Sequence, residues 1–552
     1  MNNTKQNKNY RDKSIVMQDL RLGAMHQTRI SFVRHIVRKI ANEDWNVSCT
    51  LWDMDASGFG TVIYTITTDY SEYNFVVFSQ YIEDDERNDR VIAEKWDVTF
   101  SFTQGKVDKD LLEQMRKNVP LQEAGRNTSK SLVLARANKS VRVFDYIVDN
   151  LKQGVQPDIS VLAECGYILR TTAVYGNGKF GIADFDILKN NPDFKDTFSP
   201  QMCACYLLRQ FSIDWVNHIA KQNSDTAIEL DDSIATYMGT GNATGLGMAP
   251  YLIKHPQVVD MWLTTREEAI TRVSNESITD KSYNDFIAVL KDAIQHLSEI
   301  TTIDENQGKL NTTTINELTN IVNGDKPSFN TWKDFVASTT NLSLETQEII
   351  LSSIIEIYPE LVDELSSQLN AVESLTLADD LSIGDMQKVL NENYKWATEI
   401  DFSKDENNYW FWYRSETKEE PRLGVRKEEE GSEKESPLDI ARQVNTFNNT
   451  IKDLDKDMQL AEFLINNPSM RTIARRIWTM GNSAMGDIQM NVLSKNMLPM
   501  HLLRCKLSMF GATKFDPRSD KWVQVTLFQG APLLKNVKDN KSWLFPLMPK
   551  VK

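Results

Sequence analysis

The segment best suited to binding chemistry is Gly239-Thr240-Gly241-Asn242-Ala243-Thr244-Gly245-Leu246-Gly247, which leads into Pro250. Its glycines let the backbone adopt positive φ and approach a ligand closely, and a proline suits the first turn of a helix. A loop that ends at a helix N-terminus directs free N–H groups and the positive end of the helix dipole towards an anion. The segment therefore predicts an anion-binding loop, and the alternative is a tight connection between two helices. The contact residues expected in this loop are Gly241, Asn242, Thr244 and Gly245.

A second glycine-rich segment follows Arg170, and its glycines between residues 176 and 181 satisfy the spacing G-x-G-x-x-G. A dinucleotide-binding fold needs a strand before this motif and a helix after it, whereas the preceding residues are typical of a helix. The other motifs of a protein kinase are missing as well. What remains is a polar turn in which Arg170 offers a guanidinium fork, Lys179 a point charge and Tyr175 a hydroxyl. It predicts either the lining of an active site or an ordinary surface turn.

A third candidate is the run of aromatic residues 409–413, with Arg414 and Glu416 directly after it and Arg422 further on. An aromatic wall suits a flat ligand or a cation, and the two arginines could hold an acid. The alternative is a buried strand whose rings pack on two faces. Both interpretations can hold together, with the arginines at the mouth of a site.

Proton transfer in such a site would fall to Tyr175, His255 or Glu416. His255 precedes Pro256, which biases it away from helical geometry and marks a break in the chain. An ordinary surface or capping histidine is the alternative role for this residue. The six histidines are scattered and the five cysteines show no C-x-x-C spacing, so no metal site is predicted.

Several arginines fall in segments that we expect to be helical and buried, where an arginine needs a partner. Structural pairing with nearby carboxylates is one explanation, and an anionic pocket is the other. The arginines are Arg126, Arg136, Arg142, Arg170 and Arg209, and the nearby acids are Glu123, Asp145 and Asp214.

Composition limits the class of protein. The 552 residues are too many for one ordinary core, so two or three domains are expected. With 41% hydrophobic and 25% charged residues the chain is typical of a globular protein. There is no apolar run of about 18 residues and no apolar core in the polar N-terminus, so neither a membrane span nor a secretory signal is predicted. The odd number of unpaired cysteines indicates a reducing compartment, which predicts a soluble, cytoplasmic protein.

The charge is unevenly distributed. The chain carries −15, yet residues 1–39 hold nine Lys/Arg against two Asp, a net of +7, which leaves −22 for the rest. The simplest interpretation is a basic helix that docks on an acidic body. Nucleic-acid binding through this helix is the weaker alternative, because the acidic remainder repels phosphates.

The elements that must position these residues follow from periodicity. Residues 14–41 are typical of an amphipathic helix, and the alternating segments 61–67, 74–78 and 96–102 predict an antiparallel sheet with one face covered by helix. From about residue 108 the pattern is helical for nearly three hundred residues, and 521–528 predicts a late strand. The helical segments are 199–222, 251–274, 281–300, 344–370, 384–397 and 437–466.

These elements predict a mainly α protein of the α+β class, with a large helical body, an antiparallel sheet near the N-terminus and a small C-terminal β element. The expected organisation is a disordered tail at 1–9, a helix and sheet at 10–125, a helical core with glycine-rich loops at 126–276, a helical insertion at 277–400, and a segment at 401–552 that completes the core.

The sequence favours a cytoplasmic enzyme that acts by acid–base chemistry on a small carboxylate- or phosphate-bearing molecule. It would be a lyase or isomerase, or an oxidoreductase of the flavin type, since the cofactor is not readable and a flavin or a nucleotide fits. The alternative is a non-catalytic interaction or scaffold protein. The expected partner is a small anionic molecule, with no nucleic acid and no membrane, and a homo-oligomer is compatible with the composition.

Overall fold

The computed structural model has 54% of its residues in helices and contains a mixed sheet, so the α+β class is confirmed. It describes residues 10–11, 13–16, 21, 28–83, 95–122, 129–171, 190–196, 198–245, 256–302, 305–369, 377–404, 410–414, 419–423, 438–481, 508–519, 522–539 and 543–550. Within these ranges, no helix is both long and apolar enough to cross a membrane.

A nine-stranded sheet forms the centre of the molecule, in the order β1-β2-β3-β4-β5-β6-β7-β11-β10. Every neighbouring pair is antiparallel except β6 and β7, which run parallel. A separate hairpin contains β8 and β9. The strands are β1 (Asn46–Met54), β2 (Gly60–Thr67), β3 (Glu72–Ser79), β4 (Val98–Gln104), β5 (Ser131–Lys139), β6 (Tyr167–Thr171), β7 (Gly239–Gly245), β8 (Trp410–Arg414), β9 (Glu419–Leu423), β10 (Ala512–Ser519) and β11 (Trp522–Leu527).

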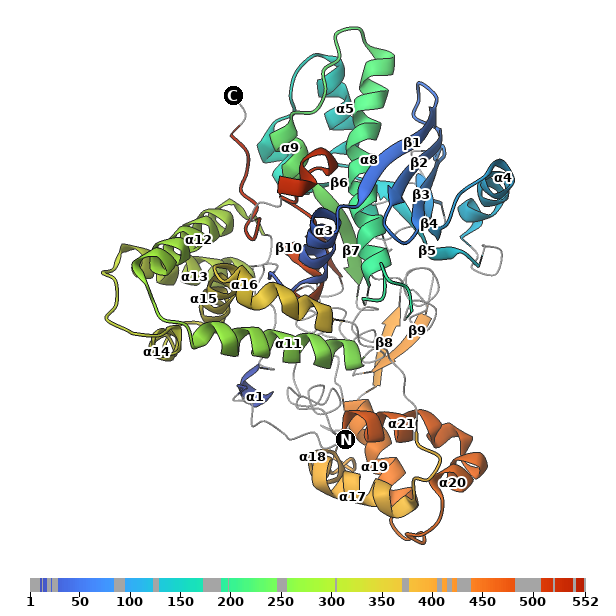
Figure 1. Ribbon diagram of the computed structural model, residues 1–552, viewed down its shortest axis with the longest axis vertical. Coiled ribbons are helices and arrows are strands. Elements are labelled where there is room, and N and C mark those ends of the chain that lie inside the picture. Colours follow the sequence, from blue (N-terminus) through green and yellow to red (C-terminus); the bar gives the residue numbers. More distant parts are fainter. Residues whose placement is uncertain are drawn as a thin grey trace.

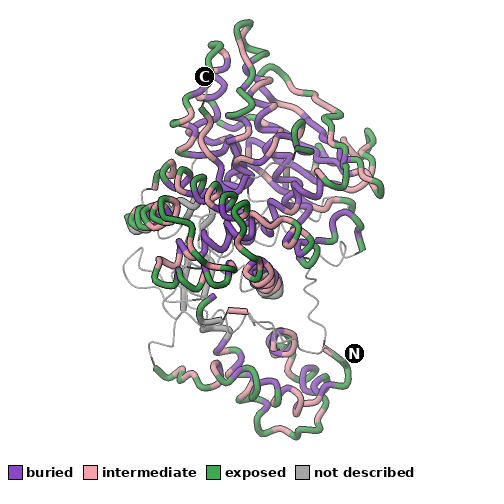
Figure 2. Tube along the Cα trace, turned by 60° about the vertical axis from the view of Figure 1, so that its left-hand side comes forward, coloured by how far each residue is buried: buried purple, intermediate pink, exposed green. Residues whose placement is uncertain are grey.

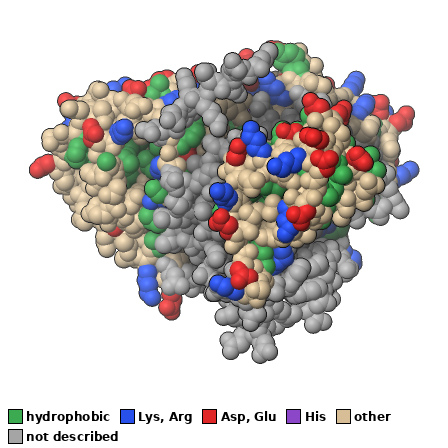
Figure 3. Space-filling model, turned by 90° about the horizontal axis from the view of Figure 1, so that it is seen from below, with side chains coloured by type: hydrophobic (Ala, Val, Ile, Leu, Met, Phe, Trp, Pro, Cys, Tyr) green, Lys and Arg blue, Asp and Glu red, His purple; other side chains and the backbone are tan. Residues whose placement is uncertain are grey.

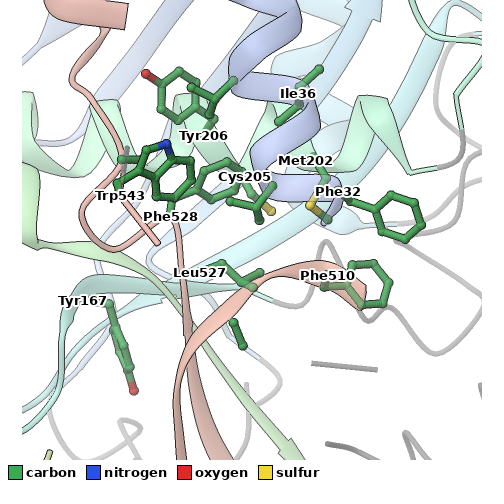
Figure 4. Packing of buried hydrophobic residues seen from close by; sticks show 14 of the residues in the cluster. Phe32, Ile36, Tyr167, Met202, Cys205, Tyr206, Phe510, Leu527, Phe528 and Trp543 are labelled. Atoms are coloured by element: carbon green, nitrogen blue, oxygen red, sulfur yellow. The ribbon is translucent and has the colours of Figure 1, made fainter. Parts of the chain in front are cut away.

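One face of the sheet is covered by α8 (Ser199–Asn223), with α5 (Phe144–Lys152) and α3 (Phe32–Asn42) packed beside it (Figure 1). Lys139 of β5 places its ammonium 4.8 Å from the centre of the Trp215 ring on α8. Phe32 of α3 contacts Phe198, with ring centroids 5.5 Å apart. Figure 4 shows side chains of α3, α8 and the C-terminal part of the chain meeting in this apolar layer. We call this surface the α8 face.

The opposite face is covered near β2–β5 by α4 (Lys109–Asn118). Met115 of α4 packs with Val76, Phe78 and Leu134, which point away from α8. The sheet is therefore enclosed on both sides here, and the expectation of one covered face is wrong.

A second group of helices follows the strand β7, and Figure 1 shows them beside and below the sheet. This group comprises α11 (Pro256–Ser274), α12 (Asp280–Glu299), α13 (Glu305–Asn323), α14 (Trp332–Ser338), α15 (Leu344–Glu356), α16 (Pro359–Val362) and the 3-10 helix η5 (Asp363–Gln368). Three short helices lie outside this group: α1 (Lys13–Val16), α6 (Ile159–Ala163) and α9 (Asp232–Tyr237).

The basic N-terminal segment docks on α11, α15 and η5 through ion pairs. Arg11 and Arg21 both contact Glu348 of α15, whereas Arg29 and Arg34 both contact Glu356 two turns later. The expectation that the basic segment docks on an acidic body is confirmed for these residues.

The helices α17 to α21 form a unit with its own hydrophobic core. Ile383, Leu390, Phe447 and Ile477 are among the buried residues of this core, which is separate from the large cluster around the sheet. Figure 2 shows the buried residues of this unit at the lower end of the molecule. The helices are α17 (Ile383–Asn393), α18 (Lys395–Thr398), α19 (Leu438–Ile451), α20 (Leu460–Asn466) and α21 (Arg471–Met480).

The strands expected at 61–67, 74–78, 96–102 and 521–528 are confirmed as β2, β3, β4 and β11. A single helix over 14–41 is wrong, because residues 28–30 are not helical and the Ser31 hydroxyl caps α3 by accepting from the Arg34 amide.

The long helical stretch after residue 108 is interrupted by β5, β6 and β7. The expected C-terminal β element is present as β10 and β11, which complete the main sheet.

Candidate functional site

The glycine-rich segment at 239–245 is a strand in the interior of the sheet, not a loop. β7 pairs with β11 from Thr240 to Gly245 and with β6 around Gly239 and Gly241. The Gly239 amide donates to the Gly166 carbonyl at 2.8 Å. The prediction that free backbone amides of this segment bind an anion is therefore wrong, because an inner strand uses its backbone groups in pairing. The helix expected from Pro250 lies outside the described residues, which resume at Pro256.

Close packing explains the glycines of β7. A Cβ atom on Gly241 would lie 2.4 Å from the Tyr167 ring, and one on Gly239 would lie 2.3 Å from the Leu527 carbonyl oxygen. Thr240 lies between them and points the other way, with its hydroxyl donating to the Cys205 carbonyl of α8 at 3.1 Å. Gly239 and Gly241 thus belong to the face opposite α8, where the strand presents no side chain. Figure 4 shows Tyr167 apart from the apolar layer, with its hydroxyl pointing away from it.

On this face one row of paired residues crosses five strands, and every member except Gly241 has a polar side chain. Residues paired in register share a face of the sheet. Asn138 pairs with Arg170, Arg170 with Gly241, Gly241 with Thr526, and Thr526 with Lys514. We call these five residues the polar row. It places an amide, a guanidinium, a bare backbone position, a hydroxyl and an ammonium next to one another.

The polar row brings two cationic side chains into the interior. Arg170 is 1% exposed and Lys514 is 4% exposed. Lys514 donates to the Ala163 and Glu164 carbonyls at 2.7 and 2.8 Å, at the C-terminal end of α6. The Asn138 side chain accepts from the Asp97 amide at 3.0 Å. These contacts fix the Lys514 ammonium and the Asn138 amide within the sheet.

The connection from β6 to β7 gives the site a second property. β6 continues through α8 and α9 to the parallel strand β7, so the two strands leave the sheet at the same edge, after Thr171 and Gly245. The carboxyl ends of adjacent parallel strands are a usual place for ligands in α/β sheets. The G-x-G-x-x-G segment therefore does follow a strand, and the expectation of a helix before it is wrong.

Several predicted site residues lie outside the described residues. These are Tyr175, Lys179, His255 and Glu416. For Asn242, Thr244 and Gly245 the structure gives the backbone in β7 but not the surroundings of the side chains. The structure therefore brings Arg170 and Gly241 together and leaves the other assignments as predictions.

The aromatic run forms a strand, as one interpretation expected. β8 pairs with β9 so that Phe411 faces Arg422 and Arg414 faces Glu419 in register. Figure 1 places this hairpin between the sheet and the α17–α21 unit. The surroundings of the Arg414 and Arg422 side chains lie outside the description, so their role as anion ligands stays a prediction.

Arg209, one of the arginines expected to pair with carboxylates, binds backbone carbonyls instead. Arg209 of α8 donates to five backbone carbonyls, which include those of Met238 at 2.6 Å and Ala531 at 2.8 Å. Burial lowers its pKa to about 10. Asp214 instead accepts from the Tyr64 hydroxyl at 2.5 Å and from Gln210 at 3.0 Å. The guanidinium carbon of Arg136 lies 4.3 Å from the centre of the Trp96 ring. Arg209 is therefore a structural residue that binds the carbonyls around α9.

The part of the chain that the structure describes contains no candidate metal site, since no three His, Cys, Asp or Glu side chains lie close enough together there to hold an ion. On the face seen from below, Lys and Arg side chains lie among Asp and Glu side chains (Figure 3).

Comparisons with protein-family models, curated proteins and solved structures gave no match for this chain. The functional argument therefore depends on the polar row and the strands that carry it.

Proposed function

We propose that this protein is an enzyme that binds a small carboxylate- or phosphate-bearing molecule at the carboxyl ends of β6 and β7. The observation that carries the proposal is the polar row, in which Arg170 lies next to Gly241 and Lys514 lies two strands beyond Gly241. A buried guanidinium offers a fixed positive charge and a planar set of donors to an anion at this edge of the sheet. The mechanism differs from the one expected from sequence, because side chains and not freed amides supply the positive charge.

Arg170 is the residue to which we assign recognition of the anion. Its guanidinium can bind a carboxylate or a phosphate through two parallel hydrogen bonds, which a lysine cannot do. Asn242, Thr244 and Gly245 continue β7 towards the edge where the strand ends. We assign them contacts with the remainder of the ligand, and we assign Lys179, Arg414 and Arg422 supporting charge.

The chemistry we propose is acid–base catalysis, of the lyase or isomerase kind. Tyr175 follows the end of β6 by four residues, and His255 immediately precedes α11. Together with Glu416, just beyond β8, they are the proposed proton-transfer groups. A flavin or nucleotide also meets the requirement for a phosphate-bearing ligand, and an oxidoreductase is then the reaction class. We propose a cytoplasmic location because the four described cysteines are free thiols.

Thermal unfolding in the presence of small carboxylates and phosphates tests the proposal. A ligand that binds only the folded protein raises Tm by an amount that grows with the logarithm of its concentration over Kd, so at equal concentration the compound that gives the largest rise identifies the class. Arg170→Gln should then weaken binding by about 10- to 100-fold, as loss of a charge-assisted hydrogen bond implies. Arg116→Gln is the matched control, because Arg116 is an exposed arginine paired with Glu113.

Native mass spectrometry of the purified wild-type protein gives an answer that does not depend on a variant. A retained metabolite with a carboxylate or phosphate group would support the proposal that this protein is an enzyme for such a molecule. If no anion in the panel raises Tm and no small molecule is retained, the binding proposal is wrong. A non-catalytic scaffold then becomes the better account.

A further inference from the structure

An unpaired side-chain amide lies in the first turn of α8. Gln201 is 0% exposed, and among the described residues neither its Nε2 donor nor its Oε1 acceptor has a hydrogen-bond partner. Bulk solvent does not reach the amide at this depth, and a buried polar group without a partner costs free energy. Because both atoms of the amide are unpaired, a group that both donates and accepts is the one that would satisfy it.

The backbone of this turn has fewer hydrogen bonds to offer. The Ser199 amide donates to the Asp196 carbonyl at 3.2 Å, and the Met202 amide donates to the carbonyl of the N-cap residue at 2.9 Å. Pro200 has no N–H group. The side chain of Gln201 is therefore the part of this turn that can select a ligand.

The position of Gln201 follows from the path of α8. This helix leads from the end of β6 back to the start of β7, so it runs opposite to both strands (Figure 1). Cys205 lies beside Thr240, because its carbonyl accepts from the Thr240 hydroxyl. Gln201, one turn before Cys205, is on the same side of the helix and therefore faces the sheet.

A comparison of lengths places Gln201 at the carboxyl end of β6. Four helical residues and two strand residues each span about 6 Å, so Gln201 is level with the second residue after Thr240. β6 ends at that level, since Arg170 pairs with Gly241 and Thr171 is the last residue of the strand. Side chains of a helix lean towards its N-terminus, which directs the amide to the edge where we place the ligand.

We propose that Gln201 binds the ligand of this site through both atoms of its amide, and that the ligand carries a hydroxyl group beside a second oxygen. Nε2 would donate to the second oxygen, and Oε1 would accept from the hydroxyl. A 2-hydroxy carboxylate and the vicinal diol of a polyol phosphate both have this chemistry, whereas a simple carboxylate and an alkyl phosphate lack it. This inference rests on the proposed function, because it narrows the substrate class of the same site.

The test is calorimetric titration of the full-length protein with two matched pairs of probes, which also separates the two sources of the hydroxyl. The pairs are lactate with propionate, and glycerol 3-phosphate with propyl phosphate. In one pair the hydroxylated probe should bind about 10-fold more tightly, as one further hydrogen bond in a buried site implies.

Gln201→Met keeps the size of the side chain and removes both polar atoms. It should reduce the preference for the hydroxylated probe to less than about two-fold. The Tm of the ligand-free variant should equal or exceed that of the wild type, because two unpaired polar atoms are removed from the interior. The matched control is Gln114→Met on the exposed surface of α4, which should keep the preference.

The outcomes separate this inference from the proposed function. If the wild type binds no anion, the proposed function fails and this inference with it. If anions bind but both pairs bind equally, or if Gln201→Met keeps the preference, the assignment of Gln201 alone is overturned. A lower Tm of the ligand-free variant would also overturn it, since the amide would then be bonded within the protein.

A crystal structure of the wild-type protein with the preferred probe gives an answer if the variant fails to fold. A probe hydroxyl within hydrogen-bond distance of the Gln201 Oε1 supports the assignment. Water molecules or protein groups at both atoms of the amide in that complex contradict it.

Discussion

The strongest structural prediction concerns Glu348, the carboxylate on which the N-terminal segment docks. Its Oε1 accepts from Arg11 at 2.6 Å and from Arg21 at 2.8 Å, and its Oε2 accepts from Arg266 at 2.5 Å. The side chain is only 1% exposed. Glu348→Gln keeps the size of the side chain but removes the charge that holds three guanidinium groups.

The expected loss of stability is about 3–5 kcal/mol at neutral pH, the usual effect of removing one partner of a buried ion pair. Burial by itself would raise the pKa of Glu348, but Arg11, Arg266 and Arg21 together lower it far below its ordinary value of 4.5. A carboxylate with a lowered native pKa stabilises the fold above its unfolded pKa, and this stabilisation is lost as pH falls. The difference between wild type and variant should therefore be largest near neutral pH and should shrink below pH of about 4.5.

The assay is urea unfolding monitored by tryptophan fluorescence over a range of pH. The matched control is Glu113→Gln, because Glu113 forms an exposed pair with Arg116 in α4. Exposed pairs are worth about 0–1 kcal/mol. If Glu348→Gln unfolds at the same urea concentration as the control, or if its deficit is the same at every pH, the reasoning about this cluster is refuted.

Three further predictions concern packing and hydrogen bonding. Gly241→Ala should lower the free energy of unfolding by about 1–3 kcal/mol, because the added methyl group overpacks against Tyr167. Gly239→Ala should lower it further, because the carbonyl oxygen that it meets cannot rotate away. Equal stability of both variants and the wild type in urea would contradict the packing argument. Arg209→Met should destabilise the fold by about 3 kcal/mol or more, since five carbonyls lose a donor, and a melting temperature within a degree of wild type would argue against this role. Leu390→Ala should cost about 2–5 kcal/mol in the α17–α21 core, so hydrogen exchange should accelerate in those helices and not in the sheet.

Sequence periodicity predicted the strands whose side chains alternate between apolar and polar. In β4 the buried Phe100 and Phe102 alternate with Thr99 and Ser101, and the strand formed as expected. The β7 sequence also alternates with period two, but between Gly or Ala and polar residues. This pattern is the signal that could have identified the strand. It predicted a loop instead, because glycine favours loops in isolation and the ring that needs the space comes from the distant Tyr167.

The site was predictable only in part for the same reason. Arg170 and Gly241 were both singled out from sequence, but separately, as parts of a turn and a loop. Pairing in register with Thr526 and Lys514 depends on contacts across hundreds of residues, which local patterns do not contain. By contrast, the docking of the basic N-terminal segment followed from the charge asymmetry alone, since an excess of one sign requires the other nearby.

The central claim is that the polar row binds an anionic molecule, and a crystal structure of the protein with the anion selected by thermal shift tests it most directly. The account predicts that the carboxylate or phosphate lies within hydrogen-bond distance of the Arg170 guanidinium, beside the face of β7 opposite α8. An anion bound elsewhere, with Arg170 held entirely by groups of the protein, would contradict it.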